Sequence, residues 1–112
     1  MKYQYELYQL DESGKDYLFM SLDKMLEKHG YTPCENEYDK VYEGTIEDRY
    51  ATHLPVPVLN ELFDLFNLRH PEDFTGHSMS VSDVVKLTDE TGRTEFWFVD
   101  SVGFKLLDPE KW

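Results

Sequence analysis

The chain has 112 residues and a formal net charge of −12, because 23 aspartates and glutamates face only 11 lysines and arginines. A field of this sign repels nucleic acid backbones and anionic membranes, which argues against direct binding of DNA, RNA or a membrane surface. Cys34 is the only cysteine, so an internal disulfide and a thiolate metal centre are both excluded.

The start of the chain predicts a protein that stays in the cytoplasm. Residues 1–10 lack both the basic start and the apolar run of a signal peptide. No apolar stretch along the chain is long enough to cross a bilayer, and a lone thiol fits a reducing compartment. The length suits one hydrophobic core, so we expect a single domain over residues 1–112.

The first half of the chain predicts a strand, a helix and a second, shorter strand. Residues 2–10 alternate, with Tyr3, Tyr5 and Leu7 on one side, which is typical of a strand. Apolar residues at helical spacing then predict a helix over about residues 15–29. Residues 38–43 favour a short strand. A connection over residues 44–57 follows, with a helical turn near residues 46–50.

The second half predicts a helix and then mainly strands. Pro57 suits the first position of a helix that ends near Leu68, and the buried face of that helix is expected to carry Leu59, Leu62, Phe63 and Phe66. Residues 82–88 and 94–99 are β-rich and are joined by a turn, which predicts a C-terminal β-hairpin. Residues 104–107 add a third short strand. The fold class is therefore α+β, with a mainly antiparallel sheet and two helices.

The segment of residues 70–83 gathers most of the reactive side chains. Ser78 or Ser80 with His77 and Asp83 supplies the residue types of a hydrolase triad, but no nucleophile elbow is present. A metal reading would use His70 and His77 with Asp73 or Asp83, in a spacing that matches no zinc pattern. We favour a structural loop whose side chains satisfy backbone donors, and we assign no catalytic residue, metal ligand or cofactor. This loop is expected to use His70, Asp73, Gly76, His77, Ser78, Ser80, Ser82 and Asp83.

A second feature is an acidic stretch in which only Lys40 and Arg49 oppose the carboxylates of residues 35–49. Alternate positions 35, 37 and 39 of an extended strand would lie about 6 to 7 Å apart, close to the phosphate spacing along one DNA strand. The stretch then forms a surface for a basic partner. The alternatives are a charged strand edge that prevents aggregation and acidity that serves solubility. The predicted contacts are Glu35, Glu37, Asp39, Tyr42, Glu43, Glu47 and Asp48.

Several short motifs resemble the YodL-like domain family of conjugative and other mobile elements of Firmicutes. The family pattern has the form FN, HP-x-DF-x-GHS-x-SVSDVV and then YVDS-x-GF. It is matched by Phe66-Asn67, His70-Pro71, Asp73-Phe74, Gly76-His77-Ser78, Ser80 to Val85, Val99-Asp100-Ser101 and Gly103-Phe104. Phe98 stands where the family usually has Tyr. The likeness extends over nearly the whole chain.

The resemblance implies no enzymatic activity but does imply a genomic setting, that of small accessory proteins of mobile elements. Anti-restriction and anti-CRISPR inhibitors come from the same setting. We therefore expect an inhibitor of a host defence nuclease, Cas9 or its guide RNA assembly first, which occupies a basic surface and does not bind nucleic acid itself. An adaptor of the transfer machinery and a hydrolase or nuclease built on residues 70–83 are the alternatives. Exposed strand edges would also allow a dimer.

Overall fold

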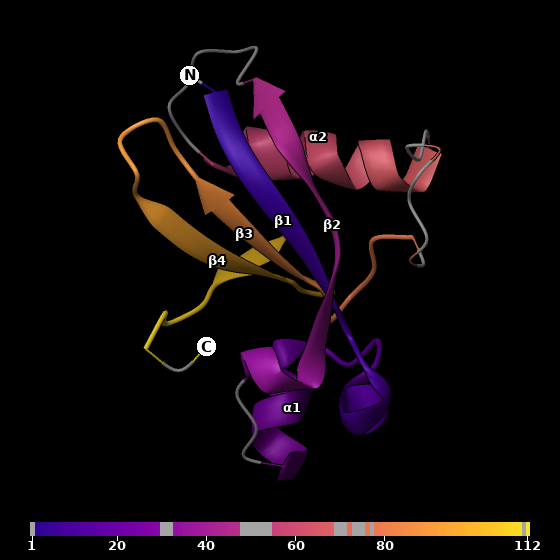
Figure 1. The fold of residues 1–112 in the computed structure, drawn as a ribbon. Coiled ribbons are helices and arrows are strands. Elements are labelled where there is room, and N and C mark those ends of the chain that lie inside the picture. Colours follow the sequence, from indigo (N-terminus) through magenta and orange to yellow (C-terminus); the bar gives the residue numbers. More distant parts are fainter. Residues whose placement is uncertain are drawn as a thin grey trace.

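The computed structural model describes residues 2–29, 33–47, 55–68, 72, 76, 78–110 and 112. Its strands are β1 (Lys2–Leu10), β2 (Tyr38–Glu47), β3 (Val84–Thr88), β4 (Thr94–Val99) and β5 (Phe104–Leu106). They form one sheet in the order β2-β1-β3-β4-β5, and every neighbouring pair is antiparallel (Figure 1). The helices are α1 (Leu22–His29) and α2 (Pro55–Leu68). The predicted α+β class, the antiparallel sheet and the C-terminal hairpin are confirmed.

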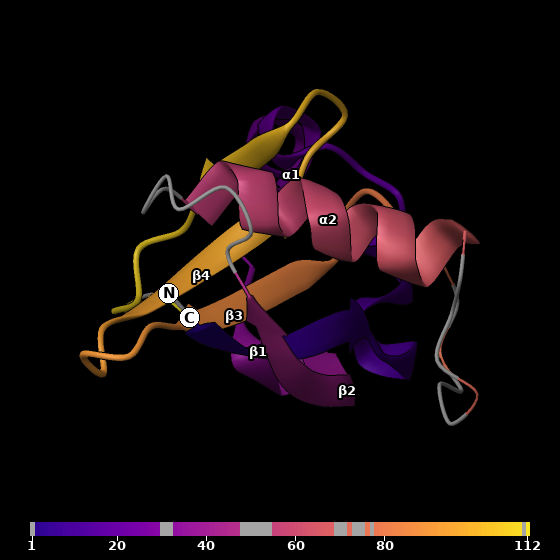
Figure 2. The same ribbon diagram turned by 90° about the horizontal axis from the view of Figure 1, so that it is seen from above.

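The main core lies between α2 and one face of the sheet, where α2 crosses the strands (Figure 2). The alternation of β1 sends Tyr3, Tyr5 and Leu7 to this face, as the sequence predicts, and all three are buried. Leu62 and Phe66 of α2 are fully buried against them. Packing of one amphipathic helix across a sheet thus joins residues from both halves of the chain.

The opposite face of the sheet is covered at one end only. There Met25 of α1 packs with Tyr38, Val84 and Phe98 in a second buried cluster, and Trp112 closes it. Figure 1 shows α1 at this end of the strands, away from α2. The other end of this face carries polar side chains from β1, β2 and β3. The sheet therefore has one apolar face and one face that is half apolar and half polar.

The first helix is shorter than predicted. Residues 12–17 form a 3-10 helix, and α1 begins only at Leu22. Phe19 adopts a φ of 64°, which breaks a continuous helix, and Ser21 then caps α1 by accepting a hydrogen bond from the Lys24 amide through its Oγ at 3.3 Å. The apolar residues keep their helical spacing on both sides of Phe19. The spacing therefore gives no sign of the break, which is set by the backbone conformation of Phe19.

The predicted bounds of two strands and of the second helix also need correction. Ile46 and Glu47 belong to β2, so the helical turn expected near residues 46–50 is wrong at its start, and the rest of that turn lies outside the described residues. β3 begins at Val84 rather than at residue 82, because Ser82 has a φ of 86°. α2 begins at Pro55, and Phe63 is 36% exposed rather than buried.

The contrast between Phe66 and Phe63 on α2 gives a test of the core. Phe66 is fully buried and makes edge contacts with the rings of Tyr5 and Tyr42, at centroid distances of 6.0 and 5.5 Å. We expect Phe66→Ala to lower the free energy of unfolding by about 3 to 5 kcal/mol, because it leaves a cavity. The matched variant Phe63→Ala should cost about 1 kcal/mol or less. Urea denaturation of both variants measures the difference, and equal losses would contradict this assignment of the core.

Candidate functional site

The described part of the motif segment is organised around the buried carboxylate of Asp83, which is 0% exposed. Its Oδ2 accepts hydrogen bonds from Gln9 Nε2 of β1 at 3.0 Å and from the Ser80 amide at 2.9 Å. Among the described residues, Oδ1 has no hydrogen-bond partner. Burial therefore dominates over the two bonds and raises the pKa of Asp83 to about 8. The carboxyl links the motif segment to the first strand.

Ser82, the residue before Asp83, holds three further segments. Its amide donates to the Val99 carbonyl at 2.9 Å, its Oγ accepts from the Phe19 amide at 3.1 Å, and its carbonyl accepts from the Tyr38 hydroxyl at 2.7 Å. These bonds hold the left-handed backbone of Ser82 in place. The side chains of Ser80, Ser82 and Asp83 thus all form hydrogen bonds within the fold.

The second motif, Asp100 to Phe104, serves the turn between β4 and β5 and the start of α1. Asp100 Oδ1 accepts from the Ser101 amide at 2.8 Å and from the Leu22 amide at 3.3 Å, at the first residue of α1. The Asp100 amide donates to the Gly103 carbonyl at 3.0 Å. Gly103 has a φ of 69°, where glycine is favoured. The motif thus joins the last turn of the sheet to α1.

The structure brings together only part of the predicted triad and metal set. His70, Asp73 and His77 lie outside the described residues, so the hydrolase and metal readings that need them are not tested. Gly76 is half-buried, Ser78 is exposed, and Ser80 Oγ donates to the Ser78 carbonyl at 2.7 Å. Within the described ranges, no group of three or more His, Cys, Asp and Glu side chains is placed to hold a metal ion.

The predicted acidic contacts lie on β2 and on the short 3-10 helix before it. The expectation that positions 35, 37 and 39 alternate along a strand is wrong, because Glu35 and Glu37 belong to the 3-10 helix Glu35–Glu37. The Glu35 amide is bound by the carbonyl of Trp112 at 3.0 Å. Asp48 lies outside the described residues. We call the remaining set the acidic edge: Glu35, Glu37, Asp39, Glu43 and Glu47, of which all except the half-buried Glu37 are exposed.

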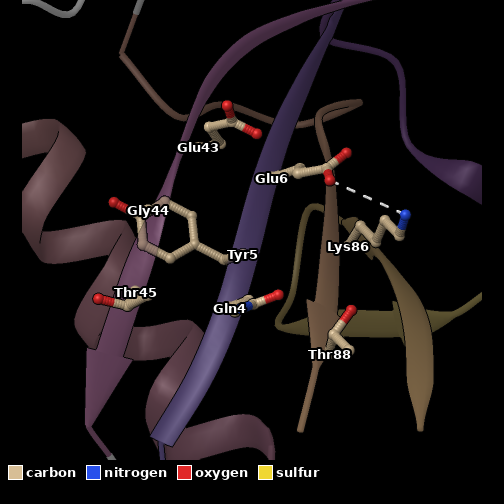
Figure 3. A pocket seen from close by; sticks show the side chains of 8 residues that line it. All are labelled: Gln4, Tyr5, Glu6, Glu43, Gly44, Thr45, Lys86 and Thr88. Atoms are coloured by element: carbon tan, nitrogen blue, oxygen red, sulfur yellow. Dashed lines mark ion pairs between the residues drawn. The ribbon is translucent and has the colours of Figure 1, made fainter. Parts of the chain in front are cut away.

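Glu43 stands beside a shallow hollow of about 290 Å³ on the polar half of the sheet. Figure 3 shows the hollow crossing β2, β1 and β3, with Glu6 turned toward Lys86. The nitrogen of Lys86 lies 3.8 Å from Glu6, and that of Lys40 lies 3.2 Å from Glu43. Glu6 and Glu43 face each other in the β1–β2 register. Like charges placed directly opposite destabilise a sheet, and the two lysines offset part of this repulsion.

Tyr8 extends this negative environment toward the 3-10 helix Glu35–Glu37. Its hydroxyl donates to Glu6 Oε1 at 2.5 Å. Partial burial, this hydrogen bond and the charges of Glu6, Glu35 and Glu43 raise the pKa of Tyr8 well above its usual range. The hydrogen bond to Glu43 likewise raises the pKa of Lys40. Carboxylates from three elements therefore act on one patch.

Aromatic residues lie beside these acids on both faces of the sheet. Tyr42 is half-buried, and its ring lies 6.3 Å from Tyr5 and 5.5 Å from Phe66, on the side of α2. Its role as a partner contact stays a prediction. Tyr8 and Trp112 instead line a hollow with Glu35 and Asp39. The sequence analysis does not assign these two residues to the site. The alternation of β1 was an available signal for Tyr8, because it puts Tyr8 on the same face as Gln4 and Glu6.

The raised pKa of Asp83 predicts an unusual dependence of stability on pH. Because the folded state favours the protonated acid, the contribution of Asp83 is fully present below about pH 4 and is lost as the pH rises toward about 8. Asp83→Asn keeps an acceptor for Gln9 and Ser80 without a charge. We expect this variant to be at least about 1 kcal/mol more stable than the natural chain at pH 8, with the advantage vanishing near about pH 4.

Urea denaturation at a series of pH values measures this difference, with Asp39→Asn as a control that removes an exposed carboxylate. Parallel pH profiles for the natural chain and Asp83→Asn would show that Asp83 is charged in the folded state.

In the described residues, no helix has the length and apolar character needed to cross a membrane.

The family of the chain follows from comparison with known proteins. No curated protein and no solved structure matches the chain. The model of the YodL-like domain matches residues 4–109 and so includes both hydrogen-bonded motifs, the whole of β2 to β5 and β1 from Gln4 onward. The chain therefore belongs to the YodL-like domain family.

Proposed function

We propose that this domain binds a partner protein by placing its acidic edge against a basic surface, without catalysing a reaction. The observation that carries the proposal is the composition of residues 35–47, where five carboxylates face only Lys40. This stretch includes the long strand β2, which lies at one border of the sheet. Such a surface speeds association with a cationic partner and selects against anionic ones.

Neighbouring elements add to the charge of the acidic edge. The Asp11 amide donates to the Glu37 carbonyl at 2.9 Å, which brings Asp11 and the exposed Glu12 beside the 3-10 helix Glu35–Glu37. Acids also occur on α1, on α2 and in the hairpin turn, so the whole domain is negative. Asp39, Glu43 and Glu47 of the acidic edge differ from these acids because they lie on β2, a border strand of the sheet.

More specifically, we propose that the partner is a host defence nuclease. A groove of lysines and arginines that holds nucleic acid has the charge that the acidic edge would select. Occupation of such a groove would block loading of guide RNA or DNA, and Cas9 is the first candidate because of the mobile-element setting that the family implies. The domain would then act as an inhibitor with no nucleic acid bound to itself.

A second candidate function is an adaptor that binds through an apolar patch beside the motif segment. Phe19 is 58% exposed. Phe19, Met20 and Val81 line a hollow of about 430 Å³. A bulky residue held at a positive φ and left exposed is a recurrent feature of functional sites, which favours this patch as a contact.

Charge reversal tests the leading proposal. We expect Asp39→Lys, Glu43→Lys and Glu47→Lys together to weaken inhibition of DNA cleavage by Cas9 at least about tenfold, because the edge would then repel a basic groove. The matched control reverses three exposed acids elsewhere: Glu27, Asp64 and Glu110. Both variants change the net charge equally, so equal loss in both would assign the effect to overall charge and remove the acidic edge from the proposal.

Salt dependence separates the two candidates. Raising ionic strength shortens the screening length from about 10 Å at 0.1 M to about 3 Å at 1 M. Partner binding through the acidic edge should therefore weaken steeply over this range, as measured by titration calorimetry. Binding through the apolar patch around Phe19 should keep the same affinity over this range and be lost in a Phe19→Ser variant, an outcome that would favour the adaptor.

A further inference from the structure

Strand β2 is the long border strand of the sheet. It has ten residues and a single neighbour, β1, whereas the opposite border, β5, has three residues. In the part of the chain that the structure describes, no strand pairs with the outer side of β2. A border strand directs every second backbone N–H and C=O outward, which makes it a template for another strand.

The regular part of β2 begins after an irregularity. The pairing with β1 shifts between Leu7 and Tyr8, so that Val41 has no partner and the register resumes at Tyr42. Residues 42–47 then pair without interruption. A bulge protects the first part of a border strand from pairing with other chains, and the regular stretch that follows is where pairing can occur.

The side chains along residues 42–47 alternate between two environments. Glu43, Thr45 and Glu47 are exposed and share the polar face of the sheet, as their pairing with Glu6, Gln4 and Lys2 shows. Tyr42 and Ile46 are half-buried against the main core. An added strand would therefore need cationic or polar residues at alternate positions and apolar residues between them.

Charge decides which strand can occupy this border. Two copies of β2 paired edge to edge would bring the carboxylates of Glu43 and Glu47 onto a shared face with their own copies, and each chain carries a net charge of −12. Like charges across a strand pair are destabilising, and opposite charges are favourable. The same carboxylates thus discourage self-pairing and accept lysine or arginine.

We propose that β2 binds an extended, basic segment of a partner protein by strand addition along residues 42–47. The segment carries Lys or Arg opposite Glu43 and Glu47, a polar residue opposite Thr45, and apolar residues opposite Gly44 and Ile46. The bound strand becomes the sixth of the sheet, beside the five that the structure contains. This inference rests on the proposed function, because it states how the acidic edge takes hold of its basic partner.

The experiment uses a synthetic peptide, Thr-Lys-Val-Thr-Val-Lys-Thr, whose palindromic sequence presents the same pattern in either strand direction. Its binding to the full chain is followed by two-dimensional NMR of the protein amides. We expect the peptide to shift the amides of residues 42–47. The charge-reversed peptide Thr-Glu-Val-Thr-Val-Glu-Thr should not bind. This acidic peptide should instead bind the double variant Glu43→Lys, Glu47→Lys, in which the border strand carries the opposite charge.

Backbone methylation then distinguishes strand addition from simple charge attraction. One peptide is N-methylated at both valines and another at both lysines, so that each loses the N–H groups on one side only. Because only one side faces β2, we expect one of the two peptides to lose affinity by about tenfold or more while the other keeps it.

The remaining outcomes overturn the proposal in different ways. Equal binding of both methylated peptides excludes strand addition and leaves the charge-based function standing. Binding of the acidic peptide to the natural chain as tightly as the basic one contradicts both proposals. Absence of any shift with the basic peptide contradicts strand addition at β2. Shifts of residues 42–47 that depend on protein concentration alone would give the border to a second copy of this chain.

Discussion

The structure depends on one buried carboxyl. Asp83 lies where β3 begins, and it receives a bond from Gln9, which is 74 positions earlier in the chain. Its backbone carbonyl accepts from the Val99 amide at 2.8 Å, so the same residue also holds β4. Ser82 adds Phe19 and Tyr38. Replacement of a buried carboxyl by an apolar residue would leave donors of two segments unsatisfied, which costs more than the bonds themselves contribute. In the described residues Ser80 to Asp83, the hydrogen bonds thus serve to join strands and loops of the fold.

This arrangement separates what local patterns predict from what they do not. The period of two in β1 and the turn between β3 and β4 are local, and both were predicted from sequence. Asp89 stabilises that turn by accepting from the amides of Thr91 and Arg93, and it lies at the expected place. The pairing of β1 with β3, and the bond from Gln9 to Asp83, join residues far apart in sequence and have no local signal. The late start of α1, at Leu22, also depends on a distant bond, that from the Phe19 amide to Ser82 Oγ.

The candidate site shows the same division. The concentration of acids in residues 35–47 was visible in the sequence, but their geometry was not, because Glu35 and Glu37 take a helical turn where a strand was expected. The involvement of Glu6 and Tyr8 depends on which positions of β1 lie beside β2, and register is a property of the assembled sheet. The partner role of Tyr42 was inferred from its place among acids, whereas its ring packs against Tyr5 and Phe66.

The motif segment and strand β2 thus hold their carboxyl groups in opposite environments. In the motif segment a carboxyl is buried, is bonded by neutral donors and is held toward its protonated form. Along β2 the carboxylates of Asp39, Glu43 and Glu47 are exposed. Glu43 faces Glu6 across the strand pair, and Lys40 pairs with Glu43 while Lys86 pairs with Glu6. An exposed ion pair such as that of Lys40 with Glu43 contributes little to stability. A fold does not need such pairs, and it pays a small cost for the facing glutamates. A cation from outside would reduce that cost further, and this is the physical ground on which we propose that the acidic edge binds a basic partner.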